Sequence, residues 1–493
     1  MQKKKKRIVK QIKSNKPKKR GFLVKFNHVK SKKKTHKPKK SFLKITSAHH
    51  KKSTQTNKKP KKKGFLQIKT IHKPSLQEEA KPTIIQTTPQ PEKHSDFGGF
   101  FEKKFENVVH KIENFMGKKV TQENINKVLA SYNKSEITIG VLGGHSALDV
   151  CRGAKLQGFR TVAVCQKGRE KTYDKYYKTR DNKGIVDEVI IVNKFSDITK
   201  KEVQEKLRSL NTIFIHNRYF WVYCDFKEIE QNFLVPIYGT RTMLKLEERD
   251  VPKNQYYLMQ KAGIRIPKIF STPKSIDRLV IVKVAEAKRS YERAFFFCSS
   301  YKQYQEKSQR LIKEKSITEE ALKIAVIEEY IVGAQVNFNY FYSPLTDELE
   351  LMGTDTRRQT NIDGLIRIPA DQQLEVLKLI KPKLVETGHI ACTTKESIIE
   401  KIFELGEKFV ATCKKEHAPG IIGPFALQGA ISADSGKEEP VIFDVSMRIP
   451  GSPGTAFTPY SGYLYQNSIS YGERIAMEIK KAKEEDKLDL ICT

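Results

Sequence analysis

Four short stretches in the second half of the chain carry residues suited to binding a nucleoside triphosphate. "LVIVKV" places Lys283 on a predicted strand, where an ammonium group can reach phosphate oxygens, although a strand-edge lysine without a ligand is the simpler reading of this motif alone. "IEEYIVG" puts Glu328 and Glu329 at a strand end, where a carboxylate can accept hydrogen bonds from ribose hydroxyls or an exocyclic amine. "GPFALQG" and "VIFDVSMR" predict paired strands whose Gln428 and Asp444 offer oxygen ligands to one Mg²⁺ or Mn²⁺ ion.

A second chemical feature lies in the first half, in "ITIGVLGGHSALDVCRGAKLQGFRTVAVC". This stretch predicts a strand, a tight glycine turn, a helix closing at Gly158 and a second strand. It lacks the third glycine of a dinucleotide-binding turn and instead places His145 and Ser146 where the helix begins. Backbone N–H groups at a helix N-terminus can hold an anion and disfavour a protonated imidazole, so we expect His145 to orient a substrate rather than carry its proton.

The elements that position these residues differ between the two halves. Short apolar strands alternate with helical stretches through "TIGVL", "TVAVC", "DEVIIV" and "TIFI", which predicts a doubly wound parallel sheet over residues 119–235. Residues 236–493 are a longer α+β region with strands of mostly antiparallel signature. We therefore predict a Rossmann-like α/β domain followed by a different, α+β domain.

The positive charge is concentrated in residues 1–77, which hold 29 Lys and Arg and no Asp or Glu, whereas the whole chain has a net charge of +36. Three repeats, "PKKRGFLVK", "PKKSFLKI" and "PKKKGFLQI", place Phe22, Phe42 and Phe65 after basic clusters. So little apolar material does not offset the cost of ordering a backbone, so we predict a disordered, lysine-rich tail over residues 1–80. A solubilising extension, an RNA or ribosome contact and a nuclear address signal, which "PKKR" resembles, remain open.

Residues 81–118 are predicted to be a linker with an amphipathic helix, because Phe101, Phe105 and Phe115 share a helical face with neighbouring aliphatic residues. The seven cysteines have no zinc-binding spacing, and no apolar stretch reaches the ~18 residues of a membrane span. No apolar segment typical of a signal peptide follows the basic N-terminus. We expect a cytoplasmic protein with free thiols.

The order of lysine strand, acidic hinge and two metal-facing strands resembles the ATP-grasp ligases. The stretches "GGHSALDVCRGAKLQGF", "FLVPIYGTR", "NFNYFYSPL", "TNIDGLIRIPA" and "IIGPFALQG" are similar, in this order, to the archaeal formate-dependent 5-formaminoimidazole-4-carboxamide ribonucleotide synthetases (PurP). The similarity covers roughly residues 119–493. It implies a pre-ATP-grasp domain, an ATP-grasp domain, and formylation of 5-aminoimidazole-4-carboxamide ribonucleotide (AICAR) with ATP and formate, by way of formyl phosphate, in purine (IMP) biosynthesis. It also implies a homo-oligomer of three or six subunits.

The resemblance assigns roles to individual residues. His145, Ser146 and Asn361 match positions that meet the ribonucleotide, Glu329 matches an ATP contact, and Gln428 and Asp444 match the Mg²⁺ positions. Arg357 is a further catalytic candidate for phosphate or formyl-phosphate charge, because it lies just upstream of Asn361.

Two departures from the family pattern bear on the substrate. The stretch after Lys283 has no glycine, so Lys288 and two nearby arginines would cover the ATP, and Tyr219 stands where a substrate-contacting serine is expected. Two alternatives therefore stay open: an ATP-grasp paralogue that joins another amine and carboxylate, and an inactive relative associated with nucleic acid.

Overall fold

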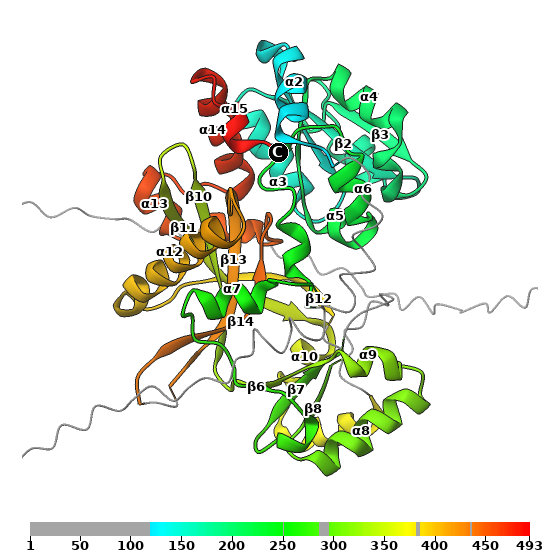
Figure 1. The fold of residues 1–493 in the computed structure, drawn as a ribbon, viewed down its shortest axis with the longest axis vertical. Coiled ribbons are helices and arrows are strands. Elements are labelled where there is room, and N and C mark those ends of the chain that lie inside the picture. Colours follow the sequence, from blue (N-terminus) through cyan, green and yellow to red (C-terminus); the bar gives the residue numbers. More distant parts are fainter. Residues whose placement is uncertain (1–118, 250, 285–294, 381–384, 434–435) are drawn as a thin grey trace, which may run out of the picture. The chain divides into compact units, whose positions relative to one another are not determined.

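Strands of the first half form a five-stranded sheet in the order β3-β2-β1-β4-β5, and every neighbouring pair in it is parallel (Figure 1). Its central strand β1 (Thr138–Leu142) is buried along its whole length, as expected of a strand covered on both faces. This confirms the doubly wound sheet predicted from the sequence. The other strands are β2 (Arg160–Gln166), β3 (Glu188–Val192), β4 (Thr212–Ile215) and β5 (Ile237–Tyr238).

The computed structural model describes residues 119–249, 251–284, 295–380, 385–433 and 436–493. The predicted tail (1–80), the predicted linker helix (81–118) and Lys288 lie outside these residues.

Helices pack on the parallel sheet, and one of them comes from far along the chain. Helix α3 (Ala147–Leu156) follows β1 and lies beside α14 (Tyr471–Glu484) (Figure 1). A Cβ atom on Gly153 would lie 2.0 Å from the backbone of Gly472, so only glycine allows these two helices to approach so closely. Shorter helices complete this part of the chain: α2 (Gln122–Ser131), α4 (Lys201–Ser209), α5 (Arg218–Tyr223), α6 (Phe226–Gln231) and α15 (Leu488–Ile491).

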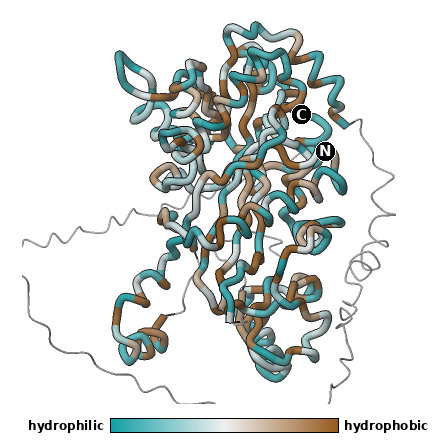
Figure 2. Tube along the Cα trace, turned by 90° about the vertical axis from the view of Figure 1, so that its left-hand side faces the viewer, coloured by the Kyte–Doolittle hydropathy of each residue, from teal (hydrophilic) through white to brown (hydrophobic). Residues whose placement is uncertain are grey.

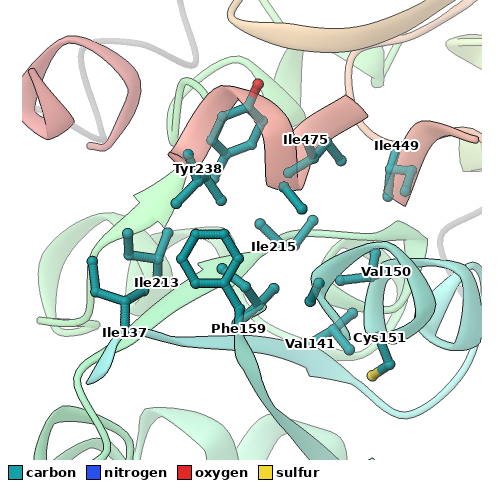
Figure 3. Close-up of a cluster of buried hydrophobic side chains, with 14 of the residues drawn as sticks. Ile137, Val141, Val150, Cys151, Phe159, Ile213, Ile215, Tyr238, Ile449 and Ile475 are labelled. Atoms are coloured by element: carbon teal, nitrogen blue, oxygen red, sulfur yellow. The ribbon is translucent and has the colours of Figure 1, made fainter. Parts of the chain in front are cut away.

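One core joins these elements. Figure 3 shows Val141 and Ile215 from the sheet, Val150 from α3 and Ile475 from α14 packed together, and each is at most 1% exposed. Hydrophobic and hydrophilic positions alternate along the chain (Figure 2), as expected of amphipathic elements with one buried side. The core therefore includes residues from both predicted domains, and the boundary at residue 235 stays a prediction.

The second half contains two further sheets, and both are antiparallel, as the sequence predicts. The five-stranded sheet has the order β12-β11-β10-β13-β14 and the four-stranded sheet the order β6-β9-β7-β8. The strands are β6 (Ile269–Phe270), β7 (Val280–Lys283), β8 (Phe295–Cys298), β9 (Val326–Glu329), β10 (Ala334–Ser343), β11 (Glu348–Gln359), β12 (Glu386–Cys392), β13 (Gly423–Ser432) and β14 (Glu439–Ser446).

Helices of the second half pack on these sheets or lie at their edges. The long helix α12 (Ile399–Glu416) buries Ile402, Phe409 and Cys413 in a core shared with β10 and β13. The remaining helices are α7 (Gln255–Lys261), α8 (Tyr301–Lys313), α9 (Glu319–Lys323), α10 (Thr360–Leu365), α11 (Ala370–Leu379) and α13 (Tyr460–Tyr465). In the described part of the chain, the two antiparallel sheets therefore follow the parallel sheet in sequence.

Candidate active site

A cavity lies where the turn after β1 meets the five-stranded antiparallel sheet. Its lining comes from the β1–α3 turn, the start of α5, strands β10 to β14, and the segment after β14. The polar and charged lining residues are His145, Arg218, Asn337, Asn339, Asp355, Arg357, Glu386, His389, Gln428, Ser446, Arg448 and Ser452.

The parallel sheet contributes its topological switch point to this cavity. Strand order reverses between β1 and β4, and ligands of open α/β sheets bind outside the carboxyl ends of the strands at such a point. Asn217, directly after β4, spans this point because its side-chain amide donates to the carbonyls of Leu142 and His145, both at 3.0 Å. The position of His145 is thereby fixed from both neighbouring strands.

His145 and Ser146 form a rigid corner of the cavity. Ser146 has a left-handed backbone (φ 68°) and donates its hydroxyl to the carbonyl of Pro450 at 2.8 Å. Its Oγ also lies 3.2 Å from Nδ1 of His145. A Cβ atom on Gly451 would lie 2.6 Å from Nε2 of His145, so this glycine leaves the imidazole its space.

Asp355 is the most enclosed carboxylate of the lining, with 1% of its surface exposed. Its two oxygens accept hydrogen bonds from the side-chain amides of Asn337 at 2.9 Å and Asn339 at 2.6 Å. Nδ1 of His389 on β12 bonds to the same carboxylate. These partners satisfy both oxygens of the buried carboxylate, as a buried polar group requires.

Polar contacts continue from His389 along the cavity lining to Gln428 and Ser446. Nε2 of His389 lies 2.9 Å from Oε1 of Glu386, and Oε2 of Glu386 lies 3.2 Å from Nε of Arg357. Arg357 in turn donates to Oε1 of Gln428, whose amide donates to the hydroxyl of Ser446 at 2.8 Å. One chain of polar contacts therefore joins residues from four strands of the sheet, β12, β11, β13 and β14.

The two histidines of the lining are driven to opposite protonation states. Burial, reinforced by the charges of Arg448 and Arg218, lowers the pKa of His145 to about 3, so this imidazole is neutral. Burial opposes the charged form of His389 too, but hydrogen bonds to Asp355 and Glu386 and the charges of these carboxylates outweigh it and raise its pKa to about 9. The helix N-terminus alone predicts a neutral His145 from the sequence, whereas in the structure burial and two arginines are the cause.

At neutral pH the cavity lining carries more positive than negative charge. Its carboxylates are Asp355 and Glu386, and its cations are Arg218, Arg357, Arg448 and protonated His389. Such a lining favours an anionic ligand, because a phosphate or carboxylate group is stabilised by desolvated guanidinium groups.

The lysine predicted to meet phosphate lies at the junction of the two antiparallel sheets. Lys283 is 5% exposed, and its Nζ lies 2.5 Å from Oε1 of Glu328. The same ammonium donates to the hydroxyl of Tyr256 at 3.2 Å and to the carbonyl of Phe443 at 3.1 Å. Glu328 is itself 2% exposed and accepts a hydrogen bond from Tyr256 at 2.8 Å, so it serves as the counter-ion of Lys283.

The other residues predicted to bind the nucleotide or the metal lie in two different places: Glu329 near the surface, and Gln428 and Asp444 on neighbouring strands. Glu329 points toward the surface and pairs with Arg278 at 3.1 Å. Gln428 and Asp444 are direct cross-strand partners on β13 and β14, so their side chains lie on the same face of the sheet. Asp444 lies 3.9 Å from a guanidinium nitrogen of Arg249.

Three predicted substrate residues, Ser146, Tyr219 and Asn361, are not part of the cavity lining. Tyr219 packs over the glycine turn: a Cβ atom on Gly144 would lie 2.0 Å from its ring. Asn361 lies in α10, just beyond the end of β11. Of the predicted ribonucleotide contacts, His145 alone therefore lines the cavity, while Ser146 supports it from the adjacent position.

Sequence reasoning missed most of the charged lining, because it did not identify β11 and β12 as strands. Asp355, Glu386 and His389 lie on these two strands, and Arg218 and Arg448 lie in stretches that carry no motif of their own. The available signal was a run of apolar and charged residues in "ELELMGTDTRRQ" and, further along the chain, a histidine three positions before Cys392 in "ETGHIAC".

Comparisons with known proteins agree with this architecture. Two family models match the chain. The model described as "Protein of unknown function (DUF1246)" matches residues 139–270, and the model described as "Domain of unknown function (DUF1297)" matches residues 303–493. The chain is 41% identical over 377 residues to the 5-formaminoimidazole-4-carboxamide-1-(beta)-D-ribofuranosyl 5'-monophosphate synthetase of Methanocaldococcus jannaschii, which covers 76% of this chain and 100% of that protein. The chain belongs to this synthetase family.

Other members of the synthetase family extend the similarity. The synthetase of Methanopyrus kandleri is 37% identical over 375 residues, covering 76% of this chain and all of the relative. The crystal structure of an IMP biosynthesis protein PurP from Thermococcus kodakaraensis matches with a TM-score of 0.53 and 25% identity, covering 72% of this chain and all of that one. These matches confirm the predicted family and the ATP-grasp fold class.

The described residues contain no cluster of three or more His, Cys, Asp or Glu side chains that could hold a metal ion. None of the helices in the same part of the chain combines the length and apolarity needed to span a membrane.

Proposed function

We propose that this protein is an ATP-dependent carbon–nitrogen ligase that formylates AICAR with formate. The names of its relatives describe them as synthetases of the formylated product, 5-formaminoimidazole-4-carboxamide ribonucleotide. The supporting observation is a cavity that joins the switch point of the parallel sheet, with His145, to the antiparallel sheet, with Arg357 and Gln428. A ribonucleotide at the switch point would present its amine toward the sheet that faces the triphosphate. We also propose that it acts in the cytoplasm.

The charges of the cavity suit the intermediates of this reaction. The γ-phosphoryl group of ATP would move to formate, and the resulting formyl phosphate carries negative charge that Arg357 and Arg448 can stabilise. Neutral His145 would hold the ribonucleotide by a hydrogen bond without adding charge. Enclosure of the cavity between elements of both halves would keep water from hydrolysing the acyl phosphate.

ATP would lie along the junction marked by Lys283. Because Lys283 is paired with Glu328 at 2.5 Å, phosphate oxygens would share this ammonium with a buried carboxylate rather than meet a free charge. The surface pair of Glu329 and Arg278 lies at the end of the same strand, in reach of the nucleoside.

Gln428 and Asp444 offer the kind of ligand atoms that a divalent cation such as Mg²⁺ prefers. An amide oxygen and a carboxylate on one face of the sheet suit Mg²⁺, which commonly binds one or two protein oxygens and takes its other ligands from phosphates and water. Bound there, it would neutralise charge on the transferring phosphoryl group. Gln428 would have to release Arg357 from its amide oxygen, which would free that guanidinium for the anion.

The test is a coupled assay of ADP formation by the purified protein. We expect turnover only when ATP, formate and AICAR are all present, and formylated AICAR as the product. Turnover with AICAR and another carboxylate, or with formate and another amine, would favour the paralogue alternative. Sedimentation of the active species would report whether it is a trimer or hexamer.

We also propose that residues 1–77 bind RNA. This stretch holds 29 basic residues and no acidic ones, and the phenylalanines between its basic clusters can stack on unpaired bases. Affinity of the full chain for a single-stranded RNA should then fall steeply with salt. A variant whose lysines in this stretch are changed to glutamine should lose this binding and keep its ligase activity. An affinity that does not respond to salt would refute the proposal.

A further inference from the structure

Glu386 is the accessible carboxylate of the cavity lining. Its side chain is 34% exposed, whereas Asp355, the other lining carboxylate, is 1% exposed and accepts bonds from two amides and an imidazole. We propose that Glu386 accepts the proton that the substrate amine loses when it attacks the activated formyl group, a role that rests on the ligase activity proposed above.

The neighbours of Glu386 hold it in one orientation. Each carboxylate oxygen has its own cationic partner: Oε1 lies 2.9 Å from Nε2 of His389, and Oε2 lies 3.2 Å from Nε of Arg357. His389 is in turn fixed through Nδ1 by Asp355. Asp355 and His389 are therefore positioning residues for the Glu386 carboxylate.

The balance of charge favours Glu386 over His145 as the acceptor. Proton transfer to Glu386 neutralises an existing charge. Transfer to His145 would create a buried cation close to Arg448 and Arg218, the same charges that lower the pKa of this histidine. Such a cation is costly in a site of low dielectric constant.

The step is balanced as follows. The lone pair of the exocyclic amine forms a bond to the carbon of formyl phosphate, and the bond from that carbon to the phosphoryl oxygen breaks. Inorganic phosphate leaves with the electron pair, and one N–H proton passes to the Glu386 carboxylate. The attacking nitrogen is positively charged in the adduct and hence strongly acidic, so a weak base flanked by two cations is sufficient.

The experiment separates the two halves of the reaction in the full-length protein. Formyl phosphate formation is followed by formate-dependent positional isotope exchange in ATP labelled with ¹⁸O at the β,γ-bridge, without AICAR. Amide formation is followed as formylated AICAR. Glu386→Gln should keep the exchange within about threefold of wild type and lower amide formation by roughly 100-fold or more, within the range for loss of a general base.

Control variants make the result specific. Glu386→Asp retains a carboxylate and should recover part of the lost rate, and Glu404→Gln, which alters an exposed carboxylate on α12, should behave as wild type. Amide formation within threefold of wild type in Glu386→Gln would overturn the assignment, as would an equal loss in both half-reactions. Absence of formate-dependent exchange in the wild type would instead overturn the proposed function, and the assignment with it.

His389 provides a readout that a merely structural role would not move. The groups that face it are Asp355 and Arg357 on β11, Glu386 on β12 and His145 on the β1–α3 turn. The rate of amide formation should fall as His389 loses its proton near pH 9, because the cation that orients Glu386 disappears. In His389→Gln this alkaline decline should be absent and the rate uniformly lower, whereas an unchanged decline would refute the positioning role.

Discussion

Replacing His389 with glutamine should destabilise the folded protein in a strongly pH-dependent way. The pKa of His389 rises from 6.5 in the unfolded chain to about 9 in the folded one, because bonds to Asp355 and Glu386 outweigh the effect of burial. The difference corresponds to about 3 kcal/mol at ~1.4 kcal/mol per pH unit. This contribution is fully present below about pH 6.5 and is lost as the pH rises through about 9, because the folded state binds the proton more tightly.

The assay is urea denaturation of wild type and His389→Gln at pH 6, 7.5 and 9.5, followed by far-UV circular dichroism. The difference in the free energy of unfolding should be about 3 kcal/mol larger at pH 6 than at high pH. His417→Gln is the matched control, because burial lowers the pKa of His417 and gives no stabilisation of this sign. A difference between wild type and His389→Gln that stays constant over this pH range would show that His389 is not held as a cation by its two carboxylates.

Three further changes test the site. Gly451→Ala should lower kcat/KM for AICAR about tenfold or more, because its Cβ would lie 2.6 Å from Nε2 of His145, whereas Gly454→Ala, whose Cβ meets only one atom at 3.9 Å, should have no effect in the same kinetics. His145→Ala should lower kcat/KM for AICAR by roughly 10- to 1000-fold with little change in melting temperature, and a variant that melts earlier but turns over normally would make His145 a scaffold residue. Asp444→Asn should reduce turnover by at least about 100-fold while AICAR binding, measured by calorimetry, persists, and near-normal turnover would remove Asp444 from the metal site.

The parallel sheet was predictable because its inner strands are buried on both faces and therefore form continuous apolar runs. Strand β1, with five buried residues in "TIGVL", is the clearest case. The turn that holds His145 was predictable for the same reason, since a glycine turn directly after a buried strand marks the carboxyl end of a parallel sheet. The tail and linker predictions, and that for Lys288, lie outside the described residues.

The charged side of the site was not predictable, because its strands lack an apolar pattern. Strand β12 has no fully buried residue, and β11 carries Thr354 and Asp355 in its buried centre. Burial of such a carboxylate depends on partners that are far away in sequence, such as the 34 residues that separate Asp355 from His389. No local sequence pattern predicts a pairing of that kind. The pairing of Lys283 with Glu328 was likewise not predictable, because it depends on β7 and β9 being neighbours in the sheet.

The contact between α3 and α14 constrains when the first sheet can mature during synthesis. Gly472 donates its N–H to the side chain of Asp149 across 323 residues of sequence, and Ile475 packs against the strands that emerge first. Domains made early on the ribosome usually fold as soon as they are complete. Here the parallel sheet is translated long before the helix that closes its core, so its apolar face stays uncovered until α14 is made. A nascent chain that stalls within the antiparallel region should therefore be a substrate for chaperones that bind exposed apolar strands.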